Sequence, residues 1–232
     1  MRHAEEVAQV CDLYASAIEL RAEGVRLVCS DEKTGIQALE RAAPTKTLQP
    51  GLTERREFEY VRHGTTCLTA NFEVATGEVI APTLSPTRDE GDFARHVEQT
   101  IAIDPDARWI FIVDNLSTHT TETLVRLIAE IEHLNVDLGK KYKSGILKSV
   151  DSRRAFLTDA ARRIRFVYTP KHCSWLNQIE IWFSILARRA LKRASFTSTT
   201  EANDAILAFI VYFNSILAKP FRWTYTGRAL AA

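Results

Sequence analysis

Two kinds of hydrophobic pattern divide the chain into predicted helices and strands. Apolar residues at three- and four-residue steps predict helices over residues 4–23, 88–101, 120–133, 174–193 and 199–217. Continuous apolar runs predict strands over residues 25–31, 57–62, 66–74, 109–114 and 165–169. Pro44 and Pro50-Gly51 predict a loop between the first two strands.

The order of these elements indicates a mixed α/β fold. Three strands come first, and helices then alternate with the last two strands before two C-terminal helices. Strands joined by short turns pair antiparallel, whereas strands separated by a helix pair in parallel. We therefore expect a five-stranded mixed sheet that is flanked by helices on both faces.

The composition is that of an ordinary globular protein, since 46% of the 232 residues are hydrophobic and 25% are charged. No apolar run approaches the roughly 20 residues of a membrane span, and the N-terminus lacks the apolar stretch of a signal peptide. We therefore expect a cytoplasmic protein without a membrane partner. Neither a zinc site nor a disulfide framework is expected, because no C-x-x-C pair occurs among the four cysteines, Cys11, Cys29, Cys67 and Cys173.

Positive charge is concentrated in one segment, although the formal net charge of the chain is only +1. This segment contains two acidic residues, Asp151 and Asp159. Its basic residues are Lys140, Lys141, Lys143, Lys148, Arg153, Arg154, Arg162, Arg163 and Arg165. Such a stretch can neutralise the phosphates of a nucleic acid. A solvated charged face is the competing interpretation, and the charge pattern alone does not decide between them.

Two predicted strands end in an aspartate, at Asp31 and at Asp114. The carboxyl ends of adjacent strands form the usual ligand site of such a sheet. Two carboxylates held close together repel each other unless a cation lies between them, and their oxygens suit Mg²⁺ or Mn²⁺. The competing interpretation makes both residues strand-end or turn residues. Glu32 points to the opposite face if the strand continues, and we expect it to be solvated or salt-bridged.

A third carboxylate, Glu180, lies three residues after Asn177 on a predicted helix with an apolar stripe. Burying a glutamate there is costly unless it is paired or bound to a metal. An ion pair with Arg188 or Lys171 is the alternative.

These segments resemble the DDE transposases of the mariner superfamily, specifically bacterial insertion-sequence transposases. The resemblance is carried by Val28-Cys-Ser-Asp31-Glu32, by Asp114-Asn115 with His119, and by Ser174-Trp-Leu-Asn177-Gln-Ile-Glu180. It covers nearly everything from Val25 to the C-terminus and implies a ribonuclease H-like fold.

The resemblance implies metal-dependent cleavage of DNA at the ends of a mobile element, followed by attack of the freed 3′-hydroxyl on target DNA. Asp31, Asp114 and Glu180 would hold two Mg²⁺ or Mn²⁺ ions, with Asp31 bridging them. Asn115, His119 and Asn177 would orient these ligands or contact phosphate. The implied partners are transposon-end and target DNA and a second copy of the chain, in the nucleoid of a bacterial cytoplasm.

The chain departs from the mariner pattern in two respects. Asp114 and Glu180 are 66 positions apart (180 − 114), and the excess is an insertion of about residues 135–163 before the last strand. This insertion resembles that of the same bacterial branch and is a candidate DNA contact through Lys140, Lys141, Lys143 and Lys148. Lys171 and His172, beside the helix of Glu180, are further candidate DNA contacts.

The second departure concerns the N-terminus. We expect a linker helix over residues 1–24 and a catalytic domain over residues 25–232, which leaves no room for the family's helix-turn-helix region. A truncated copy or an isolated catalytic domain is expected. Two alternatives stay open: an inactive remnant that only binds DNA or oligomerises, and a ribonuclease or Holliday-junction nuclease on the same fold.

Overall fold

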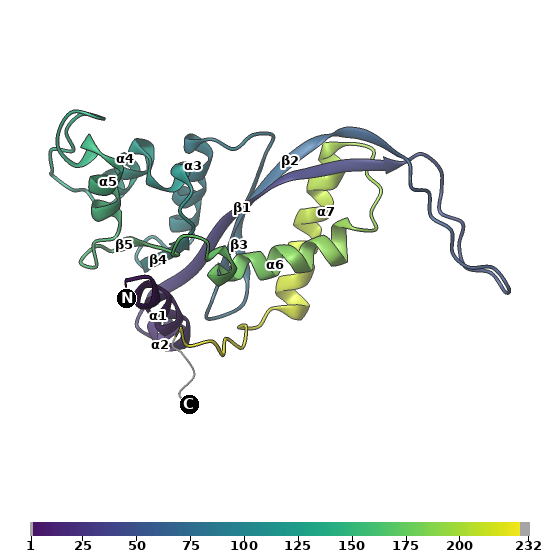
Figure 1. Cartoon of the computed structure of the whole chain (residues 1–232), viewed down its shortest axis with the longest axis horizontal. Coiled ribbons are helices and arrows are strands. Elements are labelled where there is room, and N and C mark those ends of the chain that lie inside the picture. The colour runs from purple at the N-terminus through teal and green to yellow at the C-terminus, as the bar shows by residue number, and fades with distance from the viewer. Residues whose placement is uncertain (1, 228–232) are drawn as a thin grey trace.

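A five-stranded mixed sheet forms the centre of the computed structural model, which describes residues 2–227 (Figure 1). The strand order is β3-β2-β1-β4-β5. The strands are β1 (Val25–Arg41), β2 (Tyr60–Glu73), β3 (Val79–Ser85), β4 (Arg108–Val113) and β5 (Ile164–Tyr168). β1 pairs antiparallel with β2 and parallel with β4, so the expected mixed α/β fold is confirmed.

Helices cover both faces of this sheet because side chains on its strands alternate between the two faces. Leu27, Cys29 and Ile112 pack on one face, and Val28, Phe111 and Val113 pack on the other. The first face is covered by α1 (Arg2–Ala15), α2 (Ala17–Ala22), α6 (Gln178–Leu186) and α7 (Thr199–Tyr212). The second is covered by α3 (Glu90–Ile101), α4 (Glu122–Ile131) and α5 (Val150–Leu157).

Short helical turns extend several of these helices. Three are 3₁₀ turns, η1 (Ser117–Thr120), η2 (Ile146–Lys148) and η3 (Ser174–Leu176). Two are π-helical turns that continue α6 and α7, namely η4 (Ala187–Leu191) and η5 (Phe213–Leu217). No helix among residues 2–227 is long and apolar enough to cross a membrane.

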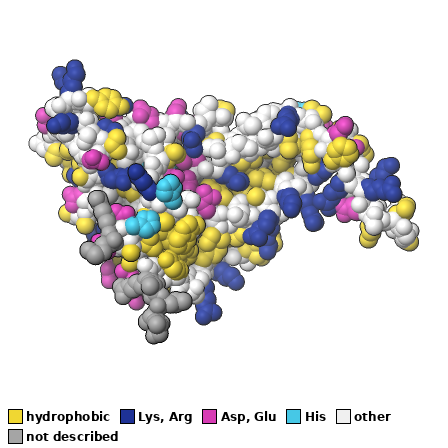
Figure 2. Space-filling view, in the orientation of Figure 1, with side chains coloured by type: hydrophobic (Ala, Val, Ile, Leu, Met, Phe, Trp, Pro, Cys, Tyr) yellow, Lys and Arg dark blue, Asp and Glu magenta, His cyan; other side chains and the backbone are white. Residues whose placement is uncertain are grey.

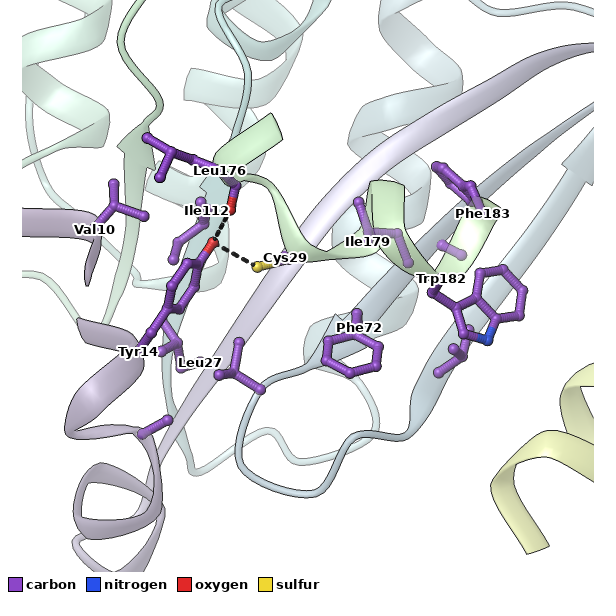
Figure 3. Packing of buried hydrophobic residues seen from close by; sticks show 14 of the residues in the cluster. Val10, Tyr14, Leu27, Cys29, Phe72, Ile112, Leu176, Ile179, Trp182 and Phe183 are labelled. Carbon is purple, nitrogen blue, oxygen red and sulfur yellow. Dashed lines mark hydrogen bonds between the residues drawn. The ribbon is translucent and has the colours of Figure 1, made fainter. Parts of the chain in front are cut away.

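The N-terminal helix packs into the core of the first face (Figure 3). Val10 and Tyr14 of α1 are buried there. The Tyr14 hydroxyl donates a hydrogen bond to the carbonyl of Leu176, at 2.6 Å, and lies 3.2 Å from the sulfur of Cys29. α1 is therefore joined to β1 and to the segment that leads into α6. All four cysteines are buried free thiols.

The prediction of separate strands over 57–62 and 66–74 was wrong, because β2 runs without a break from Tyr60 to Glu73. His63-Gly64 is a β-bulge and not a turn. Gln37 pairs with Thr65 and Leu39 with Arg62, so β2 has one extra residue there. Gly64 has a φ of +116°, which glycine tolerates. The third antiparallel strand is β3, which the sequence analysis did not predict.

The apolar pattern predicts a first strand that ends at Asp31. In the structure, β1 continues past this residue to Arg41. Its outer half pairs only with β2, and together they form a two-stranded ribbon that projects from the body (Figure 1). Residues 42–59 continue this projection as an irregular hairpin. Its two sides are joined by isolated bridges from Lys46 to Arg55 and from Gln49 to Leu52.

His96 of α3 gives the fold a pH dependence. It is fully buried, its Nδ1 lies 3.1 Å from the hydroxyl of Thr83, and burial, with a smaller effect of His119, lowers its pKa to about 3. Below about pH 6.5 His96 binds a proton in the unfolded chain but not in the folded chain. The free energy of unfolding therefore decreases as the pH falls.

We therefore predict that wild type loses about 2 kcal/mol more free energy of unfolding between pH 7 and pH 5 than His96→Gln. Urea unfolding at the two pH values measures this difference. His172→Asn, which replaces an exposed imidazole, serves as the control and should behave as wild type. Equal losses in wild type and His96→Gln would contradict the prediction.

Candidate active site

Asp31 of β1 and Asp114, the residue that directly follows β4, lie at the same end of two neighbouring parallel strands. The last registered pair of β1 and β4 is Cys29 with Ile112, and the residues two positions further along the chain (29 + 2 and 112 + 2) are the two aspartates. Paired strands are about 4.8 Å apart. Cys29 faces α6, so the alternation of side chains along β1 directs the Asp31 carboxylate to this face. Asp114 follows the end of β4, and its carboxylate contacts His119 and the Leu116 N–H.

Burial makes this pair of carboxylates electrostatically costly. Asp31 is only 6% exposed, and burial, followed by the charge of Asp114, raises its pKa to about 7. Burial also acts to raise the pKa of Asp114, but hydrogen bonds from His119 and from the Leu116 N–H outweigh it and lower that pKa. The two environments thus drive the pKa values apart, with Asp114 the more readily ionised group.

His119 joins Asp114 to a second acid, Glu32. Its Nδ1 lies 2.9 Å from Asp114 Oδ1, and its Nε2 lies 3.4 Å from Glu32 Oε1. Burial lowers the pKa of His119, but the two carboxylates outweigh burial and raise it to about 9. An imidazolium therefore bridges the two acids at neutral pH. The turn η1 positions this ring, which packs at 4.2 Å from the ring of Phe93.

Glu32 was expected to be solvated or salt-bridged, and its ion pair with His119 agrees with the second of these. Its burial beside the aspartates was not predicted. Glu32 is 9% exposed and lies on the opposite face of β1 from Asp31. The adjacent acids in Asp31-Glu32 were the available signal, because a strand that continues past Asp31 must place Glu32 in its other face.

Asn177 attaches the start of α6 to β1. Its side-chain amide is buried and donates to the carbonyl of Ser30, at 3.0 Å, and to Asp31 Oδ2, at 3.3 Å. Its own Oδ1 has no hydrogen-bond partner among the described residues, and neither has Oε2 of Glu32. Unpartnered buried oxygens beside two crowded carboxylates fit a site that accommodates a cation.

Asn115 points away from this pair, toward the end of β5. Its amide donates to the carbonyl of Thr169, and its oxygen accepts a hydrogen bond from Arg154, whose guanidinium lies 4.2 Å from the ring centre of Tyr168. Sequence reasoning missed Arg154 and Tyr168, since only the general basic character of residues 139–165 was visible. Asn115, Arg154 and Lys171 line a cavity of about 730 Å³.

The carboxylate of Glu180 does not join the aspartates. Ile179, Trp182 and Phe183 of α6 are buried against the sheet, which leaves Glu180 exposed. Its carboxylate forms no hydrogen bond or ion pair with any residue of the described range, 2–227, and the same range holds no three-residue His, Cys, Asp and Glu cluster suited to a metal. The structure therefore assembles Asp31, Asp114, His119 and Asn177, with Glu180 on the first turn of the same helix as Asn177.

The basic insertion lies away from α6. Residues 135–149 form the loop beyond α4, at the end of the molecule opposite the β1–β2 ribbon (Figure 1). Lys140, Lys143 and Lys148 are exposed, and Lys141 is half-buried. Lys171 and His172 are exposed in the loop after β5. The candidate DNA contacts thus fall into two groups, the lysines of the insertion and the pair Lys171 and His172. Only the second group is close in the chain to α6.

The repulsion between the aspartates predicts a more stable Asp31→Asn variant. The folded pKa of Asp31, about 7, exceeds its ordinary value of 3.8, so the unfolded chain releases this proton first and stability falls as the pH rises from about 4 to about 7. Without divalent cations at pH 8, the variant should unfold with a free energy higher by up to about 4 kcal/mol, and by far less at pH 5. Urea unfolding tests this, with the exposed Asp106→Asn as control; a variant less stable than wild type at pH 8 would refute it.

The fold is similar to that of solved transposase structures. The pre-cleavage Mos1 transpososome matches with a TM-score of 0.55 and 15% identity, over 90% of this chain and 55% of that one. The catalytic domain of Mos1 mariner transposase matches with a TM-score of 0.51 and 12% identity, over 91% of this chain and 82% of that one. The sheet and its helices therefore have the ribonuclease H-like fold of that domain.

The sequence comparison identifies the family. No curated protein matches the chain. A family described as DDE superfamily endonuclease matches residues 26–202, which include both aspartates and α6. The chain spans about half the length of the Mos1 chain in the transpososome. Since the match covers most of the 232 residues, the chain belongs to the DDE superfamily endonucleases.

Proposed function

We propose that this chain is the catalytic domain of a DNA transposase of the bacterial insertion-sequence type, which cleaves DNA strands and transfers them with the help of divalent metal ions. The observation that carries this proposal is the buried pair of Asp31 and Asp114 in a member of the DDE endonuclease family. Two adjacent carboxylates with unpartnered oxygens around them form a site that favours a cation.

The residues of the chain would hold and orient two Mg²⁺ or Mn²⁺ ions. When bound, such ions activate a water or hydroxyl and stabilise the leaving oxygen of a phosphodiester. Asp31 would contact both ions, and His119 keeps Asp114 ionised and fixes its orientation. Asn177 fixes the orientation of Asp31. Glu180 would complete the ligand set. Its carboxylate is exposed and has no ion pair with a described residue, so a turn toward the aspartates would break no such pair.

The known relatives support the choice of metal and of partner. Structures of the Mos1 catalytic domain are known with Mn and with Mg, and a Mos1 mariner paired-end complex is known with Mn. By analogy, we propose that this chain acts on transposon ends and target DNA as a homodimer.

One observation favours the alternative of an inactive remnant that binds DNA or oligomerises. Within residues 2–227, Glu180 does not meet the aspartates, so a three-carboxylate site is not assembled in this conformation. The two proposals differ in what they predict for metal binding, because a remnant needs no ordered ligand set.

Metal binding is the first test of the proposed site. Calorimetric titration with Mn²⁺ should show binding by wild type, loss of binding in Asp31→Ala and Asp114→Ala, and at least tenfold weaker binding in Glu180→Ala. Each variant removes hard oxygen ligands from the ion. Glu98→Ala, an exposed acid on α3, should bind as wild type. Wild-type affinity in Asp31→Ala would exclude the site, and absence of binding in wild type would favour the remnant.

Nuclease activity is the second test. With Mn²⁺, wild type should nick supercoiled plasmid DNA, and Asp114→Ala should reduce the rate at least a hundredfold because the metal site is lost. Cleavage of an RNA–DNA hybrid in preference to duplex DNA would favour the ribonuclease alternative. Equal nicking by wild type and Asp114→Ala, with both proteins purified identically, would contradict the proposal.

The basic insertion predicts a measurable salt effect. Replacing Lys140, Lys141, Lys143 and Lys148 with glutamine should weaken binding to duplex DNA and flatten the dependence of log K on log salt, because fewer counterions are released. Fluorescence anisotropy between 50 and 200 mM salt, the range over which such contacts are commonly resolved, measures the slope. An unchanged slope would remove the insertion from the DNA interface.

A further inference from the structure

Four cations gather where α6 ends and the π-helical turn η4 begins. Arg188, Arg189, Lys192 and Arg193 are all exposed. The Lys192 N–H donates to the carbonyl of Ala187, at 2.8 Å, which is the five-residue spacing of a π-helix. Single π-helical turns are rare in proteins, and those that occur are often found at functional sites. Among the described residues none of the four forms an ion pair within 4.0 Å.

These cations line two hollows that share part of their wall. One hollow, of about 540 Å³, lies between η4 and the outer half of β1, and its wall includes Lys33, Arg188 and Lys192. A second hollow, of about 670 Å³, lies between η4 and α7, and its wall includes all four cations with Phe209 and Tyr212. The two hollows adjoin at Arg188 and Lys192, which line both. We call this surface the η4 groove; Figure 2 shows Lys and Arg side chains in succession along this side of the molecule.

The η4 groove leads to the aspartate pair. Lys33 is two residues beyond Asp31 on β1 and therefore lies on the same face of the sheet. Its Nζ is 5.9 Å from the ring centre of Phe183 in α6. On the same helix, Arg188 lies eight residues after Glu180, a distance of roughly 12 Å at 1.5 Å per residue. One end of the groove thus begins beside the candidate active site.

We propose that the η4 groove binds the phosphate backbone of the DNA duplex that flanks the reacting strand end. This inference rests on the proposed function and assigns the path of its substrate. Unpaired arginines and lysines at one- to five-residue spacing match a polyanion, and a groove open to solvent admits a continuous backbone. Tyr212, 49% exposed at the far wall, offers an aromatic surface against which a sugar or base edge packs.

The salt dependence of DNA binding tests the groove. The probe is a 30-base-pair blunt duplex, titrated by fluorescence anisotropy in EDTA at several KCl concentrations. Arg188→Gln/Lys192→Gln should lower the slope of log K against log salt by about 2, since each phosphate contact contributes about 0.9. The matched control is Arg95→Gln/Arg126→Gln, two exposed arginines on α3 and α4, and it should keep the wild-type slope. Equal slopes in all three proteins would overturn the proposal.

Site-directed crosslinking tests the path. Lys192 is twelve residues beyond Glu180, or roughly 18 Å, which corresponds to about five nucleotides at 3.4 Å per step. In Lys192→Cys, a thiol-reactive group placed on single phosphates should crosslink most strongly about five nucleotides from the 3′-hydroxyl end. The native cysteines are buried, and Arg126→Cys is the control. Crosslinks spread evenly along the duplex, or equal in the control, would overturn the proposal.

Failure of this inference is distinguishable from failure of the proposed function. If wild type binds Mn²⁺ and nicks DNA while the groove variant keeps its salt slope, only the groove is refuted. If wild type binds no Mn²⁺, the active site is refuted, whereas the slopes in EDTA still report on the groove. Competition by polyglutamate as strong as that by an equal charge of duplex DNA would identify a general polyanion site and overturn the assignment to DNA.

Discussion

The parallel pairing of β1 with β4 is the constraint on which the rest of the site depends. It places Asp31, on the face of the sheet that α6 covers, beside Asp114 at the end of β4. Raising the pKa of Asp31 from 3.8 to about 7 corresponds to about 4 kcal/mol against the ionised form. The fold tolerates this cost because the sheet around the pair is apolar on both faces and well packed. A site that is unfavourable when empty is suited to binding a cation strongly.

The two faces of β1 carry different parts of the candidate site: a proposed metal ligand on one face and a supporting acid on the other. Asp31 faces α6, whereas Glu32, the next residue, faces α3 and η1. His119 links the second face back to Asp114 and carries a positive charge that both acids stabilise. Burial lowers the pKa of the neighbouring His96, the same imidazolium adds to this effect, and His96 stays neutral in the core. Protonation in this region is thus set jointly by groups on both sides of one strand.

α6 combines three roles along one helix. Asn177 at its start is buried and holds Asp31, Glu180 on its first turn is exposed, and the cations of the η4 groove follow at its end. This order follows from how the helix packs, because Ile179, Trp182 and Phe183 turn toward the sheet and leave the intervening residues to solvent. A DNA strand that follows the groove therefore approaches the aspartates along the exposed side of α6.

The sequence by itself was sufficient to predict the mixed α/β class, β4, β5 and most helices, because apolar runs and helical periodicity are local properties. It also led to Asp31 and Asp114 as neighbours, since each follows or lies within a buried strand. It did not lead to β3 or to the outer half of β1, which are held by cross-strand hydrogen bonds. The contacts of His119 with Glu32 and of Arg154 with Asn115 join residues 87 and 39 positions apart. Only tertiary packing decides such contacts, because it determines which face of each element is buried.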